Sequence, residues 1–459
     1  MTSDSRITIV GPGTVVTAFG GADVVPDGAV AWQDGRVIEV GRREVLALAH
    51  PGADVLDARG GLILPGLVNL HHHFYSSLAR GLDPACELAN FGQILGGLWW
   101  RLDRALDPET VHLSAALAAA DSIRWGATTV FDHHASPSCI TGSLKNIADV
   151  VTDAGLSAVL CYEITDRNGH GDAIAGLAEN LAFFDAHRND PTIRGMLGLH
   201  ASFTVTDATL TAVAEARRAG MGCHLHVAED LLDIEGSKTA HGKDPVSRLL
   251  EHDLVDDRML AVHGVHLESV ERRALAERGA TLIHNPESNA NNGVGRLDLE
   301  EAAADGCRIG LGTDGMSSAM LGALRAAFLG LRSGRRDPTR GFEVVPELLA
   351  VNAEVAGRFL DEPRLGRLEP GAPADLCVLD NAPPTLVSPE NVFAHLVYGC
   401  AVTPVRHTVA RGRILLEDHR FTTLDPVTIT AEAQKATPAL WERFHALEPT
   451  SSDWHSPGV

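Results

Sequence analysis

Three consecutive histidines follow an apolar run near residue 70, and their spacing is suited to binding a metal ion. The segment from Leu64 reads "LPGLVNLHHHFYSS". Because side chains alternate along a β-strand, His71 and His73 share one face and could hold one metal between them. His72 points the other way, so we expect it to pack against, or to orient, groups of a surrounding helix layer.

A second segment, "HLHVAED", places His224 and His226 on one face, with Glu229 three residues after His226. A ligand with a free carboxylate nearby is what metal-assisted hydrolysis requires, because the metal acidifies water and the carboxylate moves protons. His224 lies deeper in the strand, and we expect it to be a core residue.

Asp314 ends another apolar run, in the sequence "GLGTDG". An aspartate there could simply cap a turn. Beside three candidate histidine ligands, we favour its interpretation as a further metal ligand. The flanking glycines would let the backbone approach the site closely.

Eight apolar runs supply the strands that must position these residues. They read "LILPGLVNLHHH", "GATTVFDHH", "LSAVLCYEI", "IRGMLGLHASF", "MGCHLHVAE", "MLAVHGVHL", "ATLIHNPES" and "RIGLGTDG". Continuously apolar strands are covered on both faces, and the segments between them have helix-capping residues at their ends. The pattern predicts an α/β fold, a (β/α)₈ TIM barrel over residues 64–364. An open doubly wound sheet is the alternative, but no GxGxxG follows the first strand.

The two ends of the chain have a different residue pattern, with short runs of β-branched residues interrupted by glycine and proline. Neither end is long enough for a core of its own. We therefore expect residues 1–63 and 365–430 to form one small β-sandwich domain. Residues 431–459 are predicted to form a C-terminal helix and tail.

Half of the histidines lie at or near the C-terminal ends of the eight runs. In a parallel barrel these ends share one rim, which is where active sites are built. Alternation lets only one of His133 and His134 face inward, and the sequence does not choose between them. The eleven residues are His71, His72, His73, His133, His134, His200, His224, His226, His263, His266 and His284.

Composition excludes several classes of partner. The formal net charge of −22 disfavours nucleic acid and anionic membrane as partners. No signal peptide or membrane span is evident. The seven cysteines are scattered without a CxxC spacing, which predicts reduced thiols in a cytoplasmic protein.

The motifs "PGLVNLHHH", "HLHVAED", "LAVHGVHL", "LIHNPESNANNG" and "IGLGTDG", followed by "LGRLEPGAPADLCVLD", resemble those of the amidohydrolase superfamily. Within it, the chain is similar to the cytosine, guanine and 8-oxoguanine deaminase branch. The stretches "HHHFYSSLARGL" and "LWWRLDRAL" resemble most the SsnA-type aminohydrolases and chlorohydrolases. The resemblance covers nearly the whole chain.

The resemblance implies a role for each candidate residue. His71, His73, His226 and Asp314 would be metal ligands. Glu229 would be the proton shuttle, His263 would orient water and polarise the substrate, and Asp314 would also relay a proton to the departing ammonia. Zinc is the usual metal of the family, and iron is the alternative.

The fourth strand, "IRGMLGLHASF", has no lysine at its end. Binuclear members of the superfamily carry a lysine there, modified to a carbamate that bridges two metals. We therefore expect one divalent metal ion in this chain. This disfavours the dihydroorotase and hydantoinase side of the superfamily and is compatible with deaminases.

The predicted activity is hydrolytic deamination of an aminated heterocycle, such as a purine, oxidised purine, pteridine or pyrimidine, with release of ammonia. Hydrolytic dechlorination of a triazine-like ring is the alternative, and a non-catalytic scaffold is disfavoured because every proposed ligand is present. A homo-oligomer is expected for this type of enzyme.

Candidate substrate contacts are His200, Gln93, Trp99 and Asn289.

Overall fold

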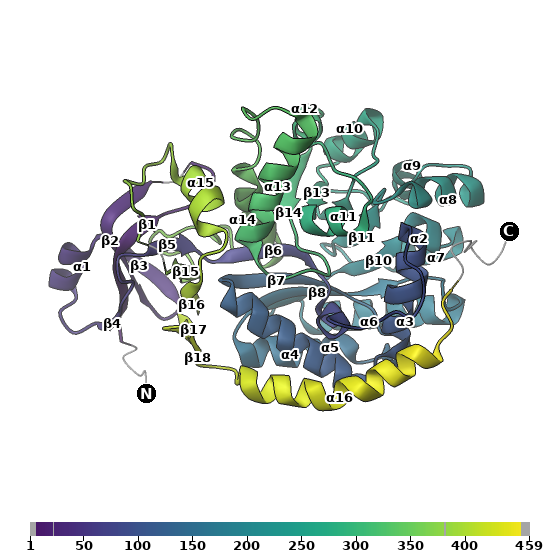
Figure 1. Ribbon diagram of the computed structural model, residues 1–459, viewed down its shortest axis with the longest axis horizontal. Helices are drawn as coiled ribbons and strands as arrows, with labels where there is room; N and C mark the ends of the chain where they lie inside the picture. The colour runs from purple at the N-terminus through teal and green to yellow at the C-terminus, as the bar shows by residue number, and fades with distance from the viewer. Residues whose placement is uncertain (1–5, 22, 381, 451–459) are drawn as a thin grey trace.

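The computed structural model describes residues 6–21, 23–380 and 382–450. It shows a large barrel with a smaller sheet beside it, and both ends of the chain contribute to the smaller sheet (Figure 1). In the part of the chain that is described, no helix combines the length and the apolar character needed to cross a bilayer. All seven cysteines are free thiols.

Eight parallel strands form the barrel, and each lies within one of the eight apolar runs. The barrel closes through a parallel bridge between His72 and Asp314, next to two amide hydrogen bonds to the carbonyl oxygen of His71. The predicted (β/α)₈ barrel is therefore confirmed, and the open doubly wound sheet is wrong. The strands follow one another in the order β6 (Leu67–His72), β7 (Ala127–His134), β8 (Ser157–Ile164), β10 (Leu197–Ala201), β11 (Cys223–Val227), β12 (Met259–His263), β13 (Thr281–His284) and β14 (Arg308–Leu311), and the short β9 (Ile193–Gly195) pairs with β8.

Helices surround the barrel strands (Figure 1). Many begin at a capping side chain; for example, the Asp107 carboxylate accepts a hydrogen bond from the amide of Thr110. The helices are α1 (Arg43–Ala49), α2 (Phe91–Ile94), α3 (Trp100–Ala105), α4 (Pro108–Arg124), α5 (Ser143–Ala154), α6 (His170–Ala186), α7 (Asp207–Ala216), α8 (Leu231–His241), α9 (Pro245–Glu251), α10 (Ser269–Glu277), α11 (Pro286–Asn292), α12 (Leu299–Ala304), α13 (Met320–Arg335), α14 (Glu347–Phe359), α15 (Val392–His395) and α16 (Pro426–Ala446), with a π-helical turn at Leu95–Trp99 between α2 and α3.

The smaller sheet joins both ends of the chain, which confirms the predicted β-domain. Its strand order is β18-β17-β16-β15-β5-β1-β2-β3, with β4 on β1, and strands of both halves share one apolar core that includes Val10, Val30, Trp32 and Val378. Its strands are β1 (Thr8–Val16), β2 (Val24–Gln33), β3 (Arg36–Arg42), β4 (Asp54–Leu56), β5 (Leu62–Pro65), β15 (Leu376–Leu379), β16 (Val405–Ala410), β17 (Arg413–Glu417) and β18 (Arg420–Phe421).

The first apolar run contains two strands instead of one, because β5 belongs to the small sheet and β6 to the barrel. Gly66 separates them. A Cβ atom at Gly66 would lie 2.3 Å from Oγ1 of Thr128, so only glycine lets the chain pass that residue. The small-sheet strand thus extends to Pro65, beyond the boundary expected at residue 63.

Asn352 on α14 holds the seam at which the barrel closes. Its Nδ2 donates to the carbonyl oxygens of Val68 (2.7 Å) and Leu311 (2.8 Å), and its Oδ1 accepts from the Leu311 amide (2.7 Å). The side chain is fully buried. One amide group therefore connects β6 to β14, the two strands that carry His71 and lead into Asp314.

Replacing Asn352 with leucine is expected to lower the free energy of unfolding by about 3–5 kcal/mol, because each buried backbone group left without a partner costs about 1–3 kcal/mol. Urea unfolding would measure the loss. Glu354→Gln on the same helix is the control: Glu354 is exposed and pairs with Arg308, and a surface pair contributes about 1 kcal/mol or less. Equal stability of the two variants would contradict a role for Asn352 in closing the barrel.

The C-terminal helix α16 crosses the outside of the barrel against α3 and α4 (Figure 1, yellow). It begins at Pro426, earlier than the expected boundary at residue 431. Trp441 Nε1 donates to the Leu78 carbonyl oxygen (3.1 Å), and Arg101 Nη2 donates to that of Phe444 (3.2 Å). These bonds hold the long segment between β6 and α4 in place.

Candidate metal centre and pocket

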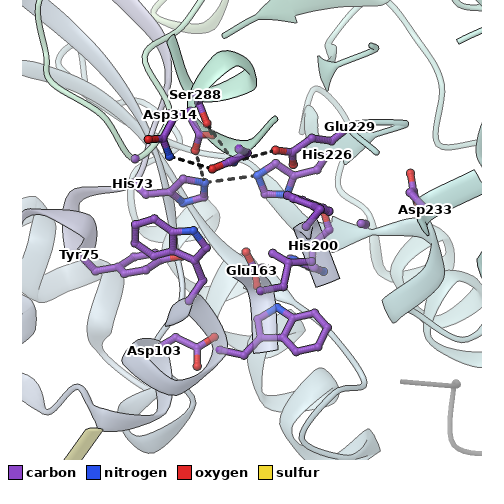
Figure 2. Close-up of a pocket in the computed structure, with 18 of the residues that line it drawn as sticks. His73, Tyr75, Asp103, Glu163, His200, His226, Glu229, Asp233, Ser288 and Asp314 are labelled. Carbon is purple, nitrogen blue, oxygen red and sulfur yellow. Dashed lines mark hydrogen bonds and ion pairs between the residues drawn. The ribbon is translucent and has the colours of Figure 1, made fainter. Parts of the chain in front are cut away.

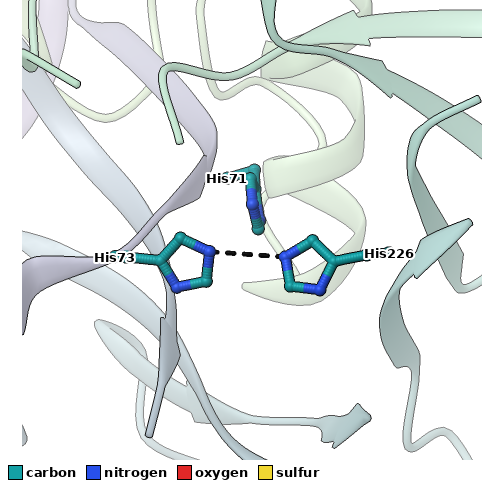
Figure 3. A group of neighbouring side chains, drawn as sticks. All are labelled: His71, His73 and His226. Carbon is teal, nitrogen blue, oxygen red and sulfur yellow. Dashed lines mark hydrogen bonds between the residues drawn. The ribbon is translucent and has the colours of Figure 1, made fainter. Parts of the chain in front are cut away.

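Three histidine rings converge at the C-terminal rim of the barrel, as Figure 3 shows. His71 belongs to β6, His73 follows it directly, and His226 belongs to β11. One ligand nitrogen from each ring lies within 4.8 Å of the other two, and the Nε2 atoms of His73 and His226 are 3.3 Å apart. The alternation expected for His71 and His73 thus brings both rings to one point.

Asp314 completes this cluster from the end of β14. Its Oδ1 lies 3.1 Å from Nε2 of His73 and 3.5 Å from Nε2 of His71, and its Oδ2 accepts a hydrogen bond from the Ser288 hydroxyl. The backbone of Asp314 has a positive φ of 54°, which is uncommon for a residue other than glycine and turns the side chain toward the barrel axis.

The far nitrogen of each ligand histidine has its own partner. Nδ1 of His73 donates to the His133 carbonyl oxygen (2.6 Å), and Nδ1 of His226 donates to that of His200 (2.7 Å). Nδ1 of His71 lies 2.9 Å from Nε2 of His224. A proton held on Nδ1 leaves the Nε2 lone pair facing the centre, which is how histidine metal ligands are oriented.

The charge balance of the cluster fits a bound cation. Burial, followed by repulsion from neighbouring rings, lowers the pKa of His226 well below its usual value, which favours a neutral ligand. Burial also lowers the pKa of His73, but the Asp314 carboxylate outweighs it and raises that pKa to about 9. The centre therefore attracts positive charge, and three nitrogens with one carboxylate suit a single divalent metal ion.

Glu229 and His263 lie beside the cluster. Nε2 of His263 is 3.4 Å from Glu229 and 3.9 Å from Asp314, and its Nδ1 donates to Oδ1 of Asn289 at 2.7 Å. Burial and the nearby Asp314 raise the pKa of Glu229 well above its usual value. A carboxyl group with a raised pKa can take up and release protons near neutral pH.

A pocket of about 780 Å³, including its mouth, opens onto these groups (Figure 2). His73, His226, Glu229 and Asp314 line one end, and aromatic side chains form much of the wall. Tyr75, Trp99 and Trp100 come from the segment that α16 holds in place. The arrangement suits a flat ring placed with one edge toward the cluster.

The model of the Amidohydrolase family matches residues 62–415 of this chain. The chain belongs to the amidohydrolase family. A 5-methylthioadenosine/S-adenosylhomocysteine deaminase of Desulforudis audaxviator is 30% identical over 437 residues, which are 93% of this chain and 97% of that protein. The predicted superfamily is therefore confirmed.

Two solved structures share this amidohydrolase fold. An adenosine deaminase from Xanthomonas campestris with bound zinc has a TM-score of 0.82 and 25% identity, over 96% of this chain and 99% of that one. An atrazine chlorohydrolase from Arthrobacter aurescens TC1 complexed with zinc has a TM-score of 0.78 and 21% identity, over 94% of this chain and 100% of that one.

Among the described residues, the amidohydrolase site offers overlapping sets of possible metal ligands. Another possible set is His71, His263 and Asp314, and a third set, His133, Glu163 and His226, shares His226 with the first. Because Nδ1 of His226 is engaged by the His200 carbonyl oxygen, a single nitrogen remains for either of the two sets that share it. Among the described residues that line the pocket there is no lysine, and the expected single metal stays a prediction.

The remaining rim histidines separate into inward and outward groups. His133 faces the barrel interior, with Nε2 at 3.1 Å from the Leu199 carbonyl oxygen, whereas His134 turns away and contacts Ser136. This resolves the choice that the sequence left open. His72 also faces outward, where Nε2 lies 3.1 Å from the Ser318 hydroxyl. His224 is a fully buried residue, and its position against His71 also gives it an orienting role.

The structure brings two of the four predicted substrate contacts to the pocket and places two elsewhere. His200 and Trp99 line the pocket, but Gln93 and Asn289 do not. The Gln93 side chain accepts a hydrogen bond from the Ala89 amide within its own turn. Asn289 lies behind His263 and holds that ring.

Several pocket residues were missed from the sequence. Ser288 and Asn292 lie one turn apart on α11, where Ser288 contacts Asp314 and Asn292 donates to Glu229 at 3.3 Å. Reading "PESNANN" as a helix would have placed them on one face of it. Glu163, at the end of β8, follows the same strand-end rule as the histidines. For Asp103, on α3, the sequence gives no signal.

Asp103 is 1% exposed, and burial raises its pKa to about 6 despite the neighbouring Arg167. Because folding raises the pKa of Asp103 from 3.8, the protonated form stabilises the folded wild type at low pH. This contribution is lost as the pH rises through about 6. Replacing Asp103 with asparagine removes this titration. The stability of the variant relative to wild type is therefore expected to increase between pH 4 and pH 7, by up to about 3 kcal/mol.

Urea unfolding at both pH values would measure this difference, and Asp149→Asn on the exposed side of α5 is the control. The control removes a surface carboxylate that pairs with Lys145, and a surface pair contributes about 1 kcal/mol or less. A pH-independent difference for Asp103→Asn would show that the carboxyl group is not destabilised by folding.

Proposed function

We propose that this amidohydrolase is a metal-dependent deaminase that hydrolyses the exocyclic amine of a heterocycle. Water replaces the amine at a ring carbon: a C–O bond forms, the C–N bond breaks, and ammonia leaves. The observation that carries the proposal is the convergence of three histidines and Asp314 beside Glu229 at one end of an aromatic-walled pocket.

We propose His71, His73, His226 and Asp314 as the ligands of one divalent cation. When bound, such a cation supplies Lewis acidity, which makes water a nucleophile at neutral pH. Glu229 takes the proton of that water and transfers it to the ring nitrogen next to the reacting carbon. His263, held by Asn289, stabilises the charge that develops on the substrate. Asp314 is proposed to take the second proton of the attacking water and pass it to the departing ammonia.

Zinc is the proposed ion. A set of three imidazole nitrogens and one carboxylate oxygen suits zinc, and iron(II) is the other ion that such a set accommodates. Elemental analysis of the purified protein would distinguish them. A stoichiometry near one metal per chain is expected, and two per chain would contradict a mononuclear site.

An ammonia-release screen tests the function. Metal-loaded protein is offered aminated purines, oxidised purines, pteridines, pyrimidines and triazines, each as free base and, where one exists, as nucleoside. Release of ammonia with formation of the oxo product supports the proposal. Chloride release from chlorinated triazines without ammonia release would favour the dechlorinase, and inactivity of a metal-loaded protein on every ring would contradict the proposal.

The expected homo-oligomer and the expected cytoplasmic location stay predictions from the sequence. Sedimentation velocity and cell fractionation test them.

A further inference from the structure

The pocket has a second polar end, which the proposed reaction does not use. Figure 2 shows Asp103 and Glu163 below the metal cluster, and both line the pocket. Nη2 of Arg167 lies 2.6 Å from Oε1 of Glu163 and 3.1 Å from Oδ2 of Asp103. All three side chains are 4% exposed or less, so their hydrogen bonds must be satisfied inside the protein or by what enters the pocket.

One acceptor atom of these three side chains is left without a hydrogen-bond partner in the part of the chain that the structure describes. Oδ1 of Asp103 is buried and has no hydrogen-bond partner among the described residues. Arg167 is shared between two carboxylates, and its guanidinium also lies 4.8 Å from the centre of the Trp100 ring. The three side chains therefore comprise two carboxylates and one cation. Asp103, whose second oxygen has no partner among the described residues, lines the pocket.

Another buried acid in the pocket wall, Asp233, has hydrogen-bond partners for both of its oxygens, unlike Asp103. Oδ1 of Asp233 accepts from the Phe203 amide (3.2 Å), and its Oδ2 accepts from the Ala228 amide (2.7 Å). Both oxygens of Asp233 are occupied by the backbone, so its role is structural. Asp103 differs because one of its oxygens is left for a group that the protein does not supply.

We propose that Asp103 binds an N–H donor of the substrate, on the edge of the ring remote from the amine that is hydrolysed. The inference rests on the proposed function and names its substrate class: a heterocycle that carries a second amino group or a ring N–H in addition to the reacting amine. A ring without that donor leaves the Asp103 oxygen buried and unpaired, and such a mismatch is rejected strongly.

Matched pairs of rings test this specificity. The pairs are 9-methyl-2,6-diaminopurine with 9-methyladenine and 2,4-diamino-1,3,5-triazine with 2-amino-1,3,5-triazine; the second ring of each pair has hydrogen in place of one amino group and has no ring N–H. For at least one pair, wild-type kcat/KM is expected to be 100-fold or more higher for the ring with the donor. Asp103→Asn places an amide NH2 group, a donor, where an acceptor oxygen was. The variant should therefore reduce this preference at least tenfold, mainly by raising KM for the ring with the donor.

Asp233→Asn is the matched control, because it makes the same change in a buried acid of the same pocket. It should lower the melting temperature and leave the preference unchanged. Asp103→Ser is the second variant, and it should also lose the preference, so that poor folding of one variant does not decide the result. Metal content is measured for all variants and should not change.

The outcomes separate the two proposals. If metal-loaded wild type releases ammonia from none of the rings in the full screen, the proposed function fails and this inference fails with it. If wild type deaminates a ring but shows no preference within either pair, or if Asp103→Asn and Asp103→Ser keep the preference, the inference alone is wrong.

Discussion

Replacing Glu229 with glutamine is expected to lower kcat by about 10²–10⁴-fold while the protein keeps its metal. This is the contribution that a positioned general acid–base group makes to catalysis. Glutamine keeps the size of the side chain and the contact with Asn292 but cannot carry the proton from water to the ring. The measurements are kcat from ammonia release and metal content by elemental analysis.

Glu235→Gln is the control for this prediction. Glu235 is an exposed residue of α8, so the control makes the same change of charge without touching the pocket. Its kcat should stay within threefold of wild type. If Glu229→Gln retained more than a tenth of wild-type turnover, Glu229 would not be the proton shuttle.

The barrel could be predicted from the sequence because its strands are buried on both faces. Each run is apolar throughout, and helices with recognisable caps separate the runs. The division of the first run at Gly66 could not be predicted, since both halves are equally apolar. Which sheet each half joins depends on the pairing of β5 with β1 and β15, which are far apart in the sequence.

The metal cluster was predictable for a related reason. The C-terminal ends of parallel strands meet at one rim, so His71, His226 and Asp314 could be expected to converge although 243 positions separate the first from the last (314 − 71). Strand alternation then selected His71 and His73 over His72. A local pattern was enough because the fold supplies the long-range geometry.

The other side of the pocket escaped prediction because connecting segments supply it. Asp103 comes from a short helix that owes its position to α16, through contacts such as the bond from Arg101 to the Phe444 carbonyl oxygen. No strand or helix period encodes such a contact. Which side chains of this segment enter the pocket depends on the π-helical turn at Leu95–Trp99.

Replacing His226 with alanine is expected to lower metal affinity by at least about 100-fold and to abolish measurable turnover. Loss of an orienting partner of a ligand already costs about 10–100-fold in affinity, and His226 is itself a proposed ligand. Metal content after dialysis would fall well below one per chain. The melting temperature should also lose its dependence on added zinc, because a metal that binds only the folded state stabilises wild type by about 4 kcal/mol at 1,000 times its Kd.

His134→Gln separates this effect from the loss of a buried ring. His134 is more deeply buried than His226 and also lies at a strand end, but it points away from the centre and contacts Ser136. The His134 variant should therefore bind close to one metal per chain, whatever its stability. If the His226 variant kept full metal content, the ligands would have to be the set that does not include it, His71, His263 and Asp314, and the proposed site would need to be redrawn around β6, β12 and β14.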